Sequence, residues 1–290
     1  MTDPALPSIP TIPIPPRTIP LTPGVEEKYQ ALLAWLARLD SALVAFSGGI
    51  DSSLVAYLSH CVLGGRALAV TSGSDSLSRE DLTLTRSLAE DWGMAHRVIH
   101  TGEMANPDYR ANPLNRCYHC KSTLYGRLAA MAREEGFGAV LNGTNRDDLG
   151  DHRPGLQAAE EFGVRAPLAD CGFDKDDIRR LARHLGLTNA DKPQAACLSS
   201  RVPYGQAISI PVLQQIERSE KALRALGFGQ LRVRHHDTVA RIEVAPEDFE
   251  KVLLHREEID AALREAGYGY VTLDLRGFRS GSLNDGLKKA

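Results

Sequence analysis

Three cysteines stand in contexts where thiol or metal chemistry is possible. Cys117 and Cys120 form a CxxC pair in NRCYHCKSTLY, and Cys197 follows much later in KPQAACLSSRVPYG. Basic residues border both stretches, and neighbouring cations favour the thiolate that attacks an electrophile or binds a metal. A CxxC pair alone is compatible with a redox pair, with zinc or iron–sulfur ligation, and with chance. The other thiols, Cys61 and Cys171, are predicted to be structural.

A glycine-rich turn in VAFSGGIDSSL connects an apolar run to a stretch with helical spacing. A strand that ends near Ser47 and a helix that begins at Ser52 present backbone N–H groups at a helix N-terminus, where the helix dipole also favours negative charge. The turn lacks the lysine of a Walker A loop and the GxGxxG spacing of a dinucleotide turn. Such turns can also serve only to redirect the chain. Its position between strand and helix nevertheless favours phosphate binding.

A second polar loop follows a short apolar run in LNGTNRDDLGDHRPG. Magnesium prefers carboxylate oxygens and bridges to phosphates, and polar loops at the carboxyl ends of parallel strands bind nucleotides. Asn and Asp are also common helix caps. We favour a nucleotide–magnesium site, with Gly143 and Thr144 near the nucleotide and Asp148 and Asp151 near the metal. The acidic and uncharged polar residues of this loop are Asn142, Thr144, Asn145, Asp147, Asp148 and Asp151.

The elements that must position these motifs alternate between helices and apolar strands. This alternation predicts an α/β fold with a doubly wound parallel sheet. The expected strands cover residues 42–46, 68–71, 95–99 and 139–142, and the expected helices cover 25–38, 52–63, 78–92, 118–133 and 175–185.

The order of elements changes after about Pro203, where helices over 211–226 and 246–266 surround LRVRHHDTVARIEV and YVTLDL. This pattern predicts a smaller C-terminal α+β domain. Side chains alternate along a strand, so Arg232 and Arg234 share one face, as do Arg241 and Glu243. These residues form either solvated cross-strand pairs or an anion site.

Three segments follow from these patterns. We expect a proline-rich flexible arm over residues 1–24, a nucleotide-binding domain over 25–205, and a small domain for substrate binding or oligomerisation over 206–290. We also expect the chain to form a homo-oligomer.

The composition narrows the class of protein. The 290 residues are 43% hydrophobic and 24% charged, with a net charge of −3, which is typical of a globular chain with a sizeable core. No apolar run reaches the roughly 20 residues that span a bilayer, and the N-terminus lacks a secretory pattern. The charge gives no general reason to bind nucleic acid. We therefore expect a cytoplasmic protein with a small-molecule substrate and with neither a membrane nor a nucleic-acid partner.

The stretch SGGxDSS, directly after the first expected strand, resembles the pyrophosphate loop of the PP-loop ATP pyrophosphatases, whose fold is adenine nucleotide alpha hydrolase-like. These enzymes cleave ATP to AMP and pyrophosphate and activate a substrate as its adenylate. The resemblance implies that Asp51 lies near the Mg²⁺ that accompanies ATP. It implies that the pyrophosphate is held by Ser47, Gly48, Gly49, Asp51, Ser52 and Ser53.

Four motifs in order, SGGIDSSL, RCYHCK, GTNRDDLGDHRPG and PQAACLSSRVPYG, resemble the LarE family of ATP-dependent sulfur transferases. That family sulfurates a pyridinium dicarboxylate mononucleotide during synthesis of the nickel-pincer nucleotide. The resemblance implies that ATP adenylylates a substrate carboxylate and that sulfur then displaces AMP, with Cys197 at the sulfur-bearing position. It also implies that Glu220, Arg232 and Arg234 hold the phosphate and ribose of the substrate.

The LarE family has two chemical versions. In one, a single cysteine gives up its sulfur and is left as dehydroalanine after one turnover. In the other, three cysteines hold a [4Fe–4S] cluster whose fourth iron carries an extra sulfide. Because Cys117, Cys120 and Cys197 are all present, we predict the cluster version, with sacrifice of Cys197 or a zinc site as alternatives. A PP-loop tRNA thiolase and a non-catalytic nucleotide-binding regulator are the competing functions.

Overall fold

The computed structural model describes residues 12, 19–150, 154–193, 196–279 and 281–283. Its chain contacts divide into two compact units. Unit 1 comprises Met1–Ser74, Arg79–Glu103 and Asn115–Ala195, and unit 2 comprises Asp75–Ser78, Met104–Leu114 and Ala196–Ala290. Unit 2 therefore draws on three separate stretches of the chain.

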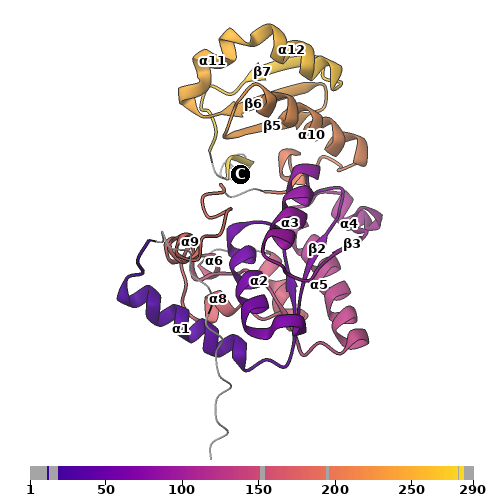
Figure 1. The fold of residues 1–290 in the computed structure, drawn as a ribbon. Helices are drawn as coiled ribbons and strands as arrows, with labels where there is room; N and C mark the ends of the chain where they lie inside the picture. Colours follow the sequence, from indigo (N-terminus) through magenta and orange to yellow (C-terminus); the bar gives the residue numbers. More distant parts are fainter. Residues whose placement is uncertain (1–11, 13–18, 151–153, 194–195, 280, 284–290) are drawn as a thin grey trace, which may run out of the picture. The chain divides into compact units, whose positions relative to one another are not determined.

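A parallel sheet of four strands forms the centre of unit 1 and confirms the predicted α/β fold class (Figure 1). The strands lie in the order β3-β2-β1-β4, so the chain moves outward from β1 to β3 and then returns to the other side of β1. In open sheets of this kind, ligands bind where the strand order reverses, at the carboxyl ends of the strands. That point lies between β1 and β4. The strands are β1 (Ala42–Ala45), β2 (Ala67–Ser72), β3 (His96–Ile99) and β4 (Ala139–Leu141).

Helices cover both faces of this sheet. Side chains alternate along each strand, so Val44 and Leu141 join one core cluster while Leu43 and Val140 join the other. The first cluster is covered by α1 (Pro23–Ala37), α2 (Ile50–Leu63) and α9 (Lys175–His184). The second is covered by α5 (Arg116–Glu135) and α7 (Pro154–Glu161). The remaining elements of this part of the chain are η1 (Gly64–Arg66), α3 (Arg79–Asp91), η2 (Glu103–Ala105), α6 (Arg146–Leu149) and α8 (Pro167–Asp170).

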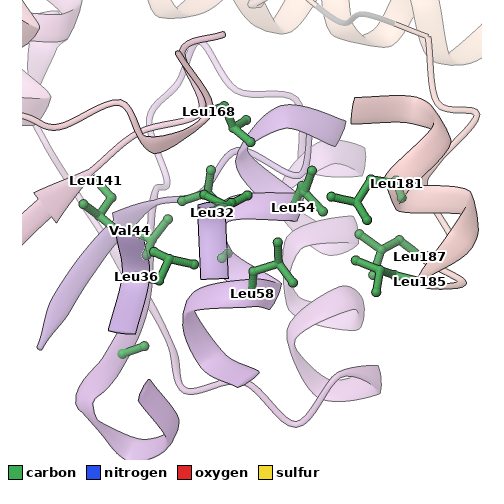
Figure 2. Close-up of a cluster of buried hydrophobic side chains, with 14 of the residues drawn as sticks. Leu32, Leu36, Val44, Leu54, Leu58, Leu141, Leu168, Leu181, Leu185 and Leu187 are labelled. Carbon is green, nitrogen blue, oxygen red and sulfur yellow. The ribbon is translucent and has the colours of Figure 1, made fainter. Parts of the chain in front are cut away.

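Leucines hold α2 in place beneath the turn that precedes it. Figure 2 shows Leu181 of α9 pointing toward Leu54 of α2, with Leu32 and Leu36 of α1 in the same cluster. These four side chains are 0% exposed. Burying one leucine contributes about 1.5–3 kcal/mol, so this cluster fixes the N-terminus of α2 at the end of β1. Ile12, which falls in the arm predicted to be flexible, is also buried in this core.

Unit 2 contains a second, mixed sheet in the order β5-β6-β7, with an antiparallel β5–β6 pair and a parallel β6–β7 pair. Its core includes Leu223, Val233 and Ile242. The helix expected over 246–266 is interrupted at His255, whose backbone leaves helical geometry at φ −98° and ψ 17°. The elements are α4 (Pro107–Arg110), η3 (Leu198–Arg201), α10 (Ile210–Ala225), β5 (Leu231–His236), β6 (Val239–Val244), η4 (Pro246–Asp248), α11 (Phe249–Leu254), α12 (Arg256–Glu265) and β7 (Tyr270–Leu273).

Across the described part of the chain, every helix is too short or too polar to cross a membrane.

Candidate active site

The glycine turn joins β1 directly to α2, which begins at Ile50, two residues earlier than expected. Gly48 has φ +71°, a left-handed conformation that glycine adopts without strain. The Ser52 hydroxyl accepts the Ser47 N–H at 3.2 Å and donates to the Gly49 carbonyl at 3.0 Å. These two bonds connect the turn to the first turn of α2. In this structure, Ser47 and Ser52 therefore fix the shape of the turn.

Asn189 braces the turn from a distant part of unit 1. Its amide nitrogen donates to the Gly48 carbonyl at 3.1 Å and to the Ser53 hydroxyl at 2.8 Å. Ser53 is 0% exposed and Asn189 is 5% exposed. Sequence reasoning missed Asn189 because 136 residues separate it from Ser53 and no local spacing connects them. A direct contact between Ser53 and phosphate stays a prediction.

The loop after β4 approaches the start of α2 very closely at Gly143. A Cβ at this position would lie 2.6 Å from the Ser52 nitrogen and 2.8 Å from the Asp51 carbonyl carbon. Both atoms belong to the backbone, so they cannot move aside cheaply. Glycine at this position is what allows the two polar loops to meet at the switch point of the sheet.

The rest of this loop is organised as a helix cap. The Asn145 side chain accepts the backbone N–H groups of Asp147 and Asp148, and the Asp148 carboxylate accepts the Asn145 N–H at 3.2 Å. Asp147 accepts the Lys175 N–H at 3.0 Å and so links the loop to α9. The helix-cap alternative is therefore observed, and because Asn145 also contacts Asp51, the nucleotide–magnesium site stays a prediction. Asp151 falls outside the described residues.

Asp51 lies where these segments meet. Asn145 donates to its Oδ2 at 3.4 Å, and Lys175 Nζ lies 3.8 Å from the same oxygen. Its Oδ1 is buried, with no hydrogen-bond partner among the described residues. Burial raises the pKa of Asp51, and Asp148 adds to this, while Lys175, Asn145 and Arg179 oppose it. A buried carboxylate oxygen without a partner, beside a second carboxylate, suits a divalent cation.

The cysteines are all free thiols. Cys117 and Cys120 lie in the first turns of α5, on the same side of the helix because they are three residues apart. Cys117 and Cys197 are exposed, and the Cys197 carbonyl accepts a hydrogen bond from Arg201 at 3.0 Å. Accessible thiols at this spacing suit thiolate ligation of a cluster. The pair belongs to unit 1 and Cys197 to unit 2, and the convergence of the three sulfurs stays a prediction.

Within the described residues, no three His, Cys, Asp or Glu side chains are grouped closely enough to hold a metal ion. The predicted Mg²⁺ and [4Fe–4S] sites therefore remain predictions.

Unit 2 contains a buried charge network centred on Glu220, which is 1% exposed. Its carboxylate accepts two bonds from Arg201, at 2.8 and 3.0 Å, one from Arg224 at 3.1 Å and one from the Val233 N–H at 3.1 Å. Burial alone would raise the pKa of Glu220, but Arg201 and the other donors hold it below its ordinary value. Glu220 therefore positions Arg201 and β5, and its predicted contact with a substrate stays a prediction.

Arg234 is held by a second set of contacts. It donates to the Ser200 carbonyl at 2.7 Å, to Glu243 at 2.9 Å and to Ser282 at 2.7 Å. Its Nε is buried, with no hydrogen-bond partner among the described residues. Arg234 also lines a pocket of about 310 Å³, which we call the arginine pocket. The charged and titratable side chains of this pocket are Arg201, Arg234, His236, Arg241, Asp274, Arg276 and Arg279.

Arg232 occupies a different environment from Arg234. Its guanidinium lies over the Phe278 ring, 5.1 Å from the centroid, and donates to the Leu231 carbonyl at 2.7 Å. Burial and the charge of Arg201 lower its pKa to about 10. A phosphate contact of Arg232 stays a prediction. Strand alternation predicts Arg241 at this site, but no sequence pattern indicates Arg276 or Arg279, which lie beyond the last strand.

Comparison with known proteins agrees with this geometry. A family model described as NAD synthase matches residues 36–110, which include β1, the glycine turn, α2, β2 and β3. The chain is 45% identical over 267 residues to an uncharacterized protein of Synechocystis sp., covering 91% of this chain and 100% of that protein. It is 36% identical over 169 residues to an uncharacterized protein of Methanocaldococcus jannaschii, covering 58% and 66%.

A further relative carries a specific name. Over 264 residues the chain is 39% identical to the pyridinium-3,5-bisthiocarboxylic acid mononucleotide synthase of Lactiplantibacillus plantarum, covering 91% of this chain and 96% of that protein. The four motifs, the parallel sheet and this coverage agree. The chain therefore belongs to the LarE family of PP-loop proteins.

Proposed function

We propose that the protein is an ATP-dependent sulfur transferase that converts a carboxylate of a pyridinium-3,5-dicarboxylate mononucleotide into a thiocarboxylate. The observation that carries this proposal is the unpartnered Oδ1 of Asp51, buried beside Lys175 at the switch point of the sheet. The identity to the synthase of Lactiplantibacillus plantarum supports the choice of substrate.

In the first step, a carboxylate oxygen of the substrate attacks the α-phosphorus of ATP, and the bond to the pyrophosphate breaks. Bound Mg²⁺ would neutralise charge on the phosphates, and Asp51 is the residue placed to hold it. The Lys175 ammonium lies 3.8 Å from Asp51 Oδ2. With Asp51 holding Mg²⁺, Lys175 would be available to bind the phosphate oxygens. The products of this step are an acyl adenylate and pyrophosphate.

In the second step, a sulfur nucleophile attacks the acyl carbon, and AMP leaves. If the thiolate of Cys197 attacks, a thioester forms; loss of its Cα proton and cleavage of its Cβ–S bond then release the thiocarboxylate and leave dehydroalanine. In the version we favour, Cys117, Cys120 and Cys197 would hold a [4Fe–4S] cluster, which would supply a replaceable sulfide as the nucleophile. The exposure of Cys117 and Cys197 supports either role.

The arginine pocket is our candidate for the phosphate and ribose of the mononucleotide. Planar guanidinium groups bind phosphate through paired hydrogen bonds, and the Nε of Arg234 is buried and lacks a partner among the described residues. Arg241, which pairs with Asp274 and Glu243, contributes a second guanidinium to the same pocket.

Replacement of Asp51 tests the first step. Asp51→Asn keeps the shape of the side chain but removes the charge that would hold the metal, and we expect AMP formation to fall about a thousandfold. Asp91→Asn is the control, because Asp91 is an exposed aspartate at the end of α3. Equal AMP formation by Asp51→Asn and wild-type protein, measured with the mononucleotide present, would refute the proposed site.

The sulfur source is tested by intact-mass spectrometry after anaerobic reconstitution. A sacrificed Cys197 would lower the chain mass by about 34 Da and limit the yield to one product per chain. In the cluster version the chain mass stays constant, the yield exceeds one, and Cys117→Ser abolishes multiple turnover. Cys171→Ser is the control. Stoichiometric dehydroalanine in iron-loaded protein would contradict the cluster version.

A further inference from the structure

A hollow on the outer face of α9 lies next to the candidate ATP site and has no part in the reaction described above. Its volume is about 340 Å³, and Ile19, Asp176, Arg179, Arg180 and Arg183 line it. All five residues belong to unit 1. Three guanidinium groups face one carboxylate, so the hollow is suited to an anion.

The position of the hollow follows from the amphipathic character of α9. Ile178, Leu181 and Ala182 are 0% exposed and pack into the core, and Figure 2 shows Leu181 pointing inward. Residues 176, 179, 180 and 183 therefore fall on the opposite side of the helix. Lys175 opens the same helix, with its Nζ 3.8 Å from Asp51. A row of cations thus begins at the candidate ATP site and continues along α9.

The arginines of this row differ in their hydrogen bonds and ion pairs. Arg183 donates to Asp191 at 2.9 and 2.5 Å. Arg179 is half-buried, and across the described residues neither a hydrogen bond nor an ion pair engages its guanidinium. Arg180 is exposed and likewise has no such partner among those residues. A half-buried guanidinium without an acceptor is available to a ligand, because burial without a partner is costly.

Arg179 also connects the hollow to the ATP site. It lies one helical turn after Lys175, and its charge acts on the Asp51 carboxylate. An anion that leaves Asp51 and Lys175 on this side therefore meets Arg179 next, and Arg180 beyond it. The anion that the proposed reaction releases is inorganic pyrophosphate.

We infer that the hollow lined by Arg179 and Arg180 is an exit site that binds the pyrophosphate released from ATP. This inference rests on the proposed function, because it takes its ligand from that reaction. We expect this site to be specific for the departing product, so that neither AMP nor an uncleaved ATP analogue uses Arg180.

The inference is tested by calorimetric titration of magnesium pyrophosphate, AMP and α,β-methylene-ATP into the full-length protein. We expect Arg179→Gln/Arg180→Gln to weaken pyrophosphate binding by about tenfold and to change the affinity for AMP and the ATP analogue by less than about twofold. Arg180→Gln alone, at an exposed position, serves as a variant that keeps the fold. Arg133→Gln is the control, because Arg133 is an exposed arginine of α5 and is not part of the lining of the hollow.

Two results overturn the exit site. Unchanged pyrophosphate affinity in the double variant shows that the arginines do not bind it, and an equal loss for the ATP analogue shows that they belong to the ATP site itself. Failure of the proposed function gives a different result, in which the wild-type protein binds neither AMP nor the ATP analogue.

Discussion

The candidate ATP site of unit 1 and the arginine pocket of unit 2, both of which we propose to bind anions, are built from different parts of the chain. The first consists mainly of backbone and short side chains, with Gly48 in a left-handed conformation and Gly143 against the backbone of α2. The second consists of long cationic side chains held by buried carboxylates such as Glu220 and Glu243. The geometry of the first site therefore depends on backbone shape, and that of the second depends on the balance of buried charges.

This difference predicts which kind of substitution damages each site. A single added methyl group damages a backbone site, whereas a charge change that preserves the shape damages the arginine pocket. The largest effect is expected in the charge network of unit 2.

Glu220→Gln removes the charge that balances buried Arg201 while keeping the volume of the side chain. We expect the free energy of unfolding of unit 2 to fall by about 3–5 kcal/mol at pH 7, because a buried cation loses its partner. Glu257→Gln is the control, since Glu257 is 85% exposed. Urea unfolding followed by circular dichroism measures the difference, and equal stability of the two variants would contradict this account of the network.

The same substitution predicts a pH dependence. The pKa of Glu220 in the folded protein lies below its ordinary value of 4.5, so its stabilisation is present above that pH and is lost as the pH falls through the folded pKa. The stability difference between wild type and Glu220→Gln should therefore shrink below pH 4.5. A stability difference between the two proteins that grows as the pH falls would contradict this prediction.

Gly143→Ala tests the backbone site. The new Cβ would lie 2.6 Å from the Ser52 nitrogen, which forces the two loops apart. A displacement of about 1 Å can cost a hundredfold in rate, and we expect a loss of that size in AMP formation. Gly150→Ala is the matched control, because no heavy atom lies within 4 Å of its added Cβ. Equal rates for the two variants would show that the close approach is unimportant.

Arg234→Lys keeps the positive charge but removes the planar guanidinium. We expect the KM for the mononucleotide to rise about tenfold while kcat changes little, because paired hydrogen bonds to phosphate are lost. Arg256→Lys is the control, at a side chain that is 68% exposed. A fall in kcat with an unchanged KM would place Arg234 outside the binding site.

The smallest effect that we expect is a change in mononucleotide affinity on protonation of His236. Burial, followed by Arg241 and neighbouring cations, lowers its pKa below the ordinary value of 6.5, so the ring is neutral at pH 7. Protonation as the pH falls through this lowered pKa adds a cation to the pocket, and we expect wild type then to gain about threefold in mononucleotide affinity relative to His236→Gln. Because both proteins bind the same ligand, protonation of the ligand phosphate changes both affinities equally and does not affect their ratio. An identical pH profile for the two proteins would contradict this.

Local pattern was sufficient to predict the sheet of unit 1 and the turn at its first strand. The apolar runs and the SGG turn are contiguous in the sequence, and strand periodicity identifies them without tertiary information. The meeting of the Gly143 loop with α2 followed from parallel strands ending at the same edge.

The contacts that the sequence could not predict join distant residues. Asn189 reaches Gly48 over 141 positions, and Arg234 reaches Ser282 over 48. Lys175 was assigned only to a helix, because nothing near it in the sequence indicates that its side chain faces Asp51. Side-chain networks of this kind depend on tertiary packing, and no periodicity encodes them.

The central claim is that ATP cleavage at the α-phosphorus is coupled to thiolation of the mononucleotide. The most direct measurement counts AMP, pyrophosphate and thiocarboxylate by mass spectrometry after the full-length, anaerobically reconstituted protein reacts with Mg²⁺, ATP and the mononucleotide. We predict one AMP and one pyrophosphate for each thiocarboxylate formed, and almost no AMP when the mononucleotide is omitted. Formation of ADP and phosphate in place of AMP, or a thiocarboxylate made without ATP, would contradict the account.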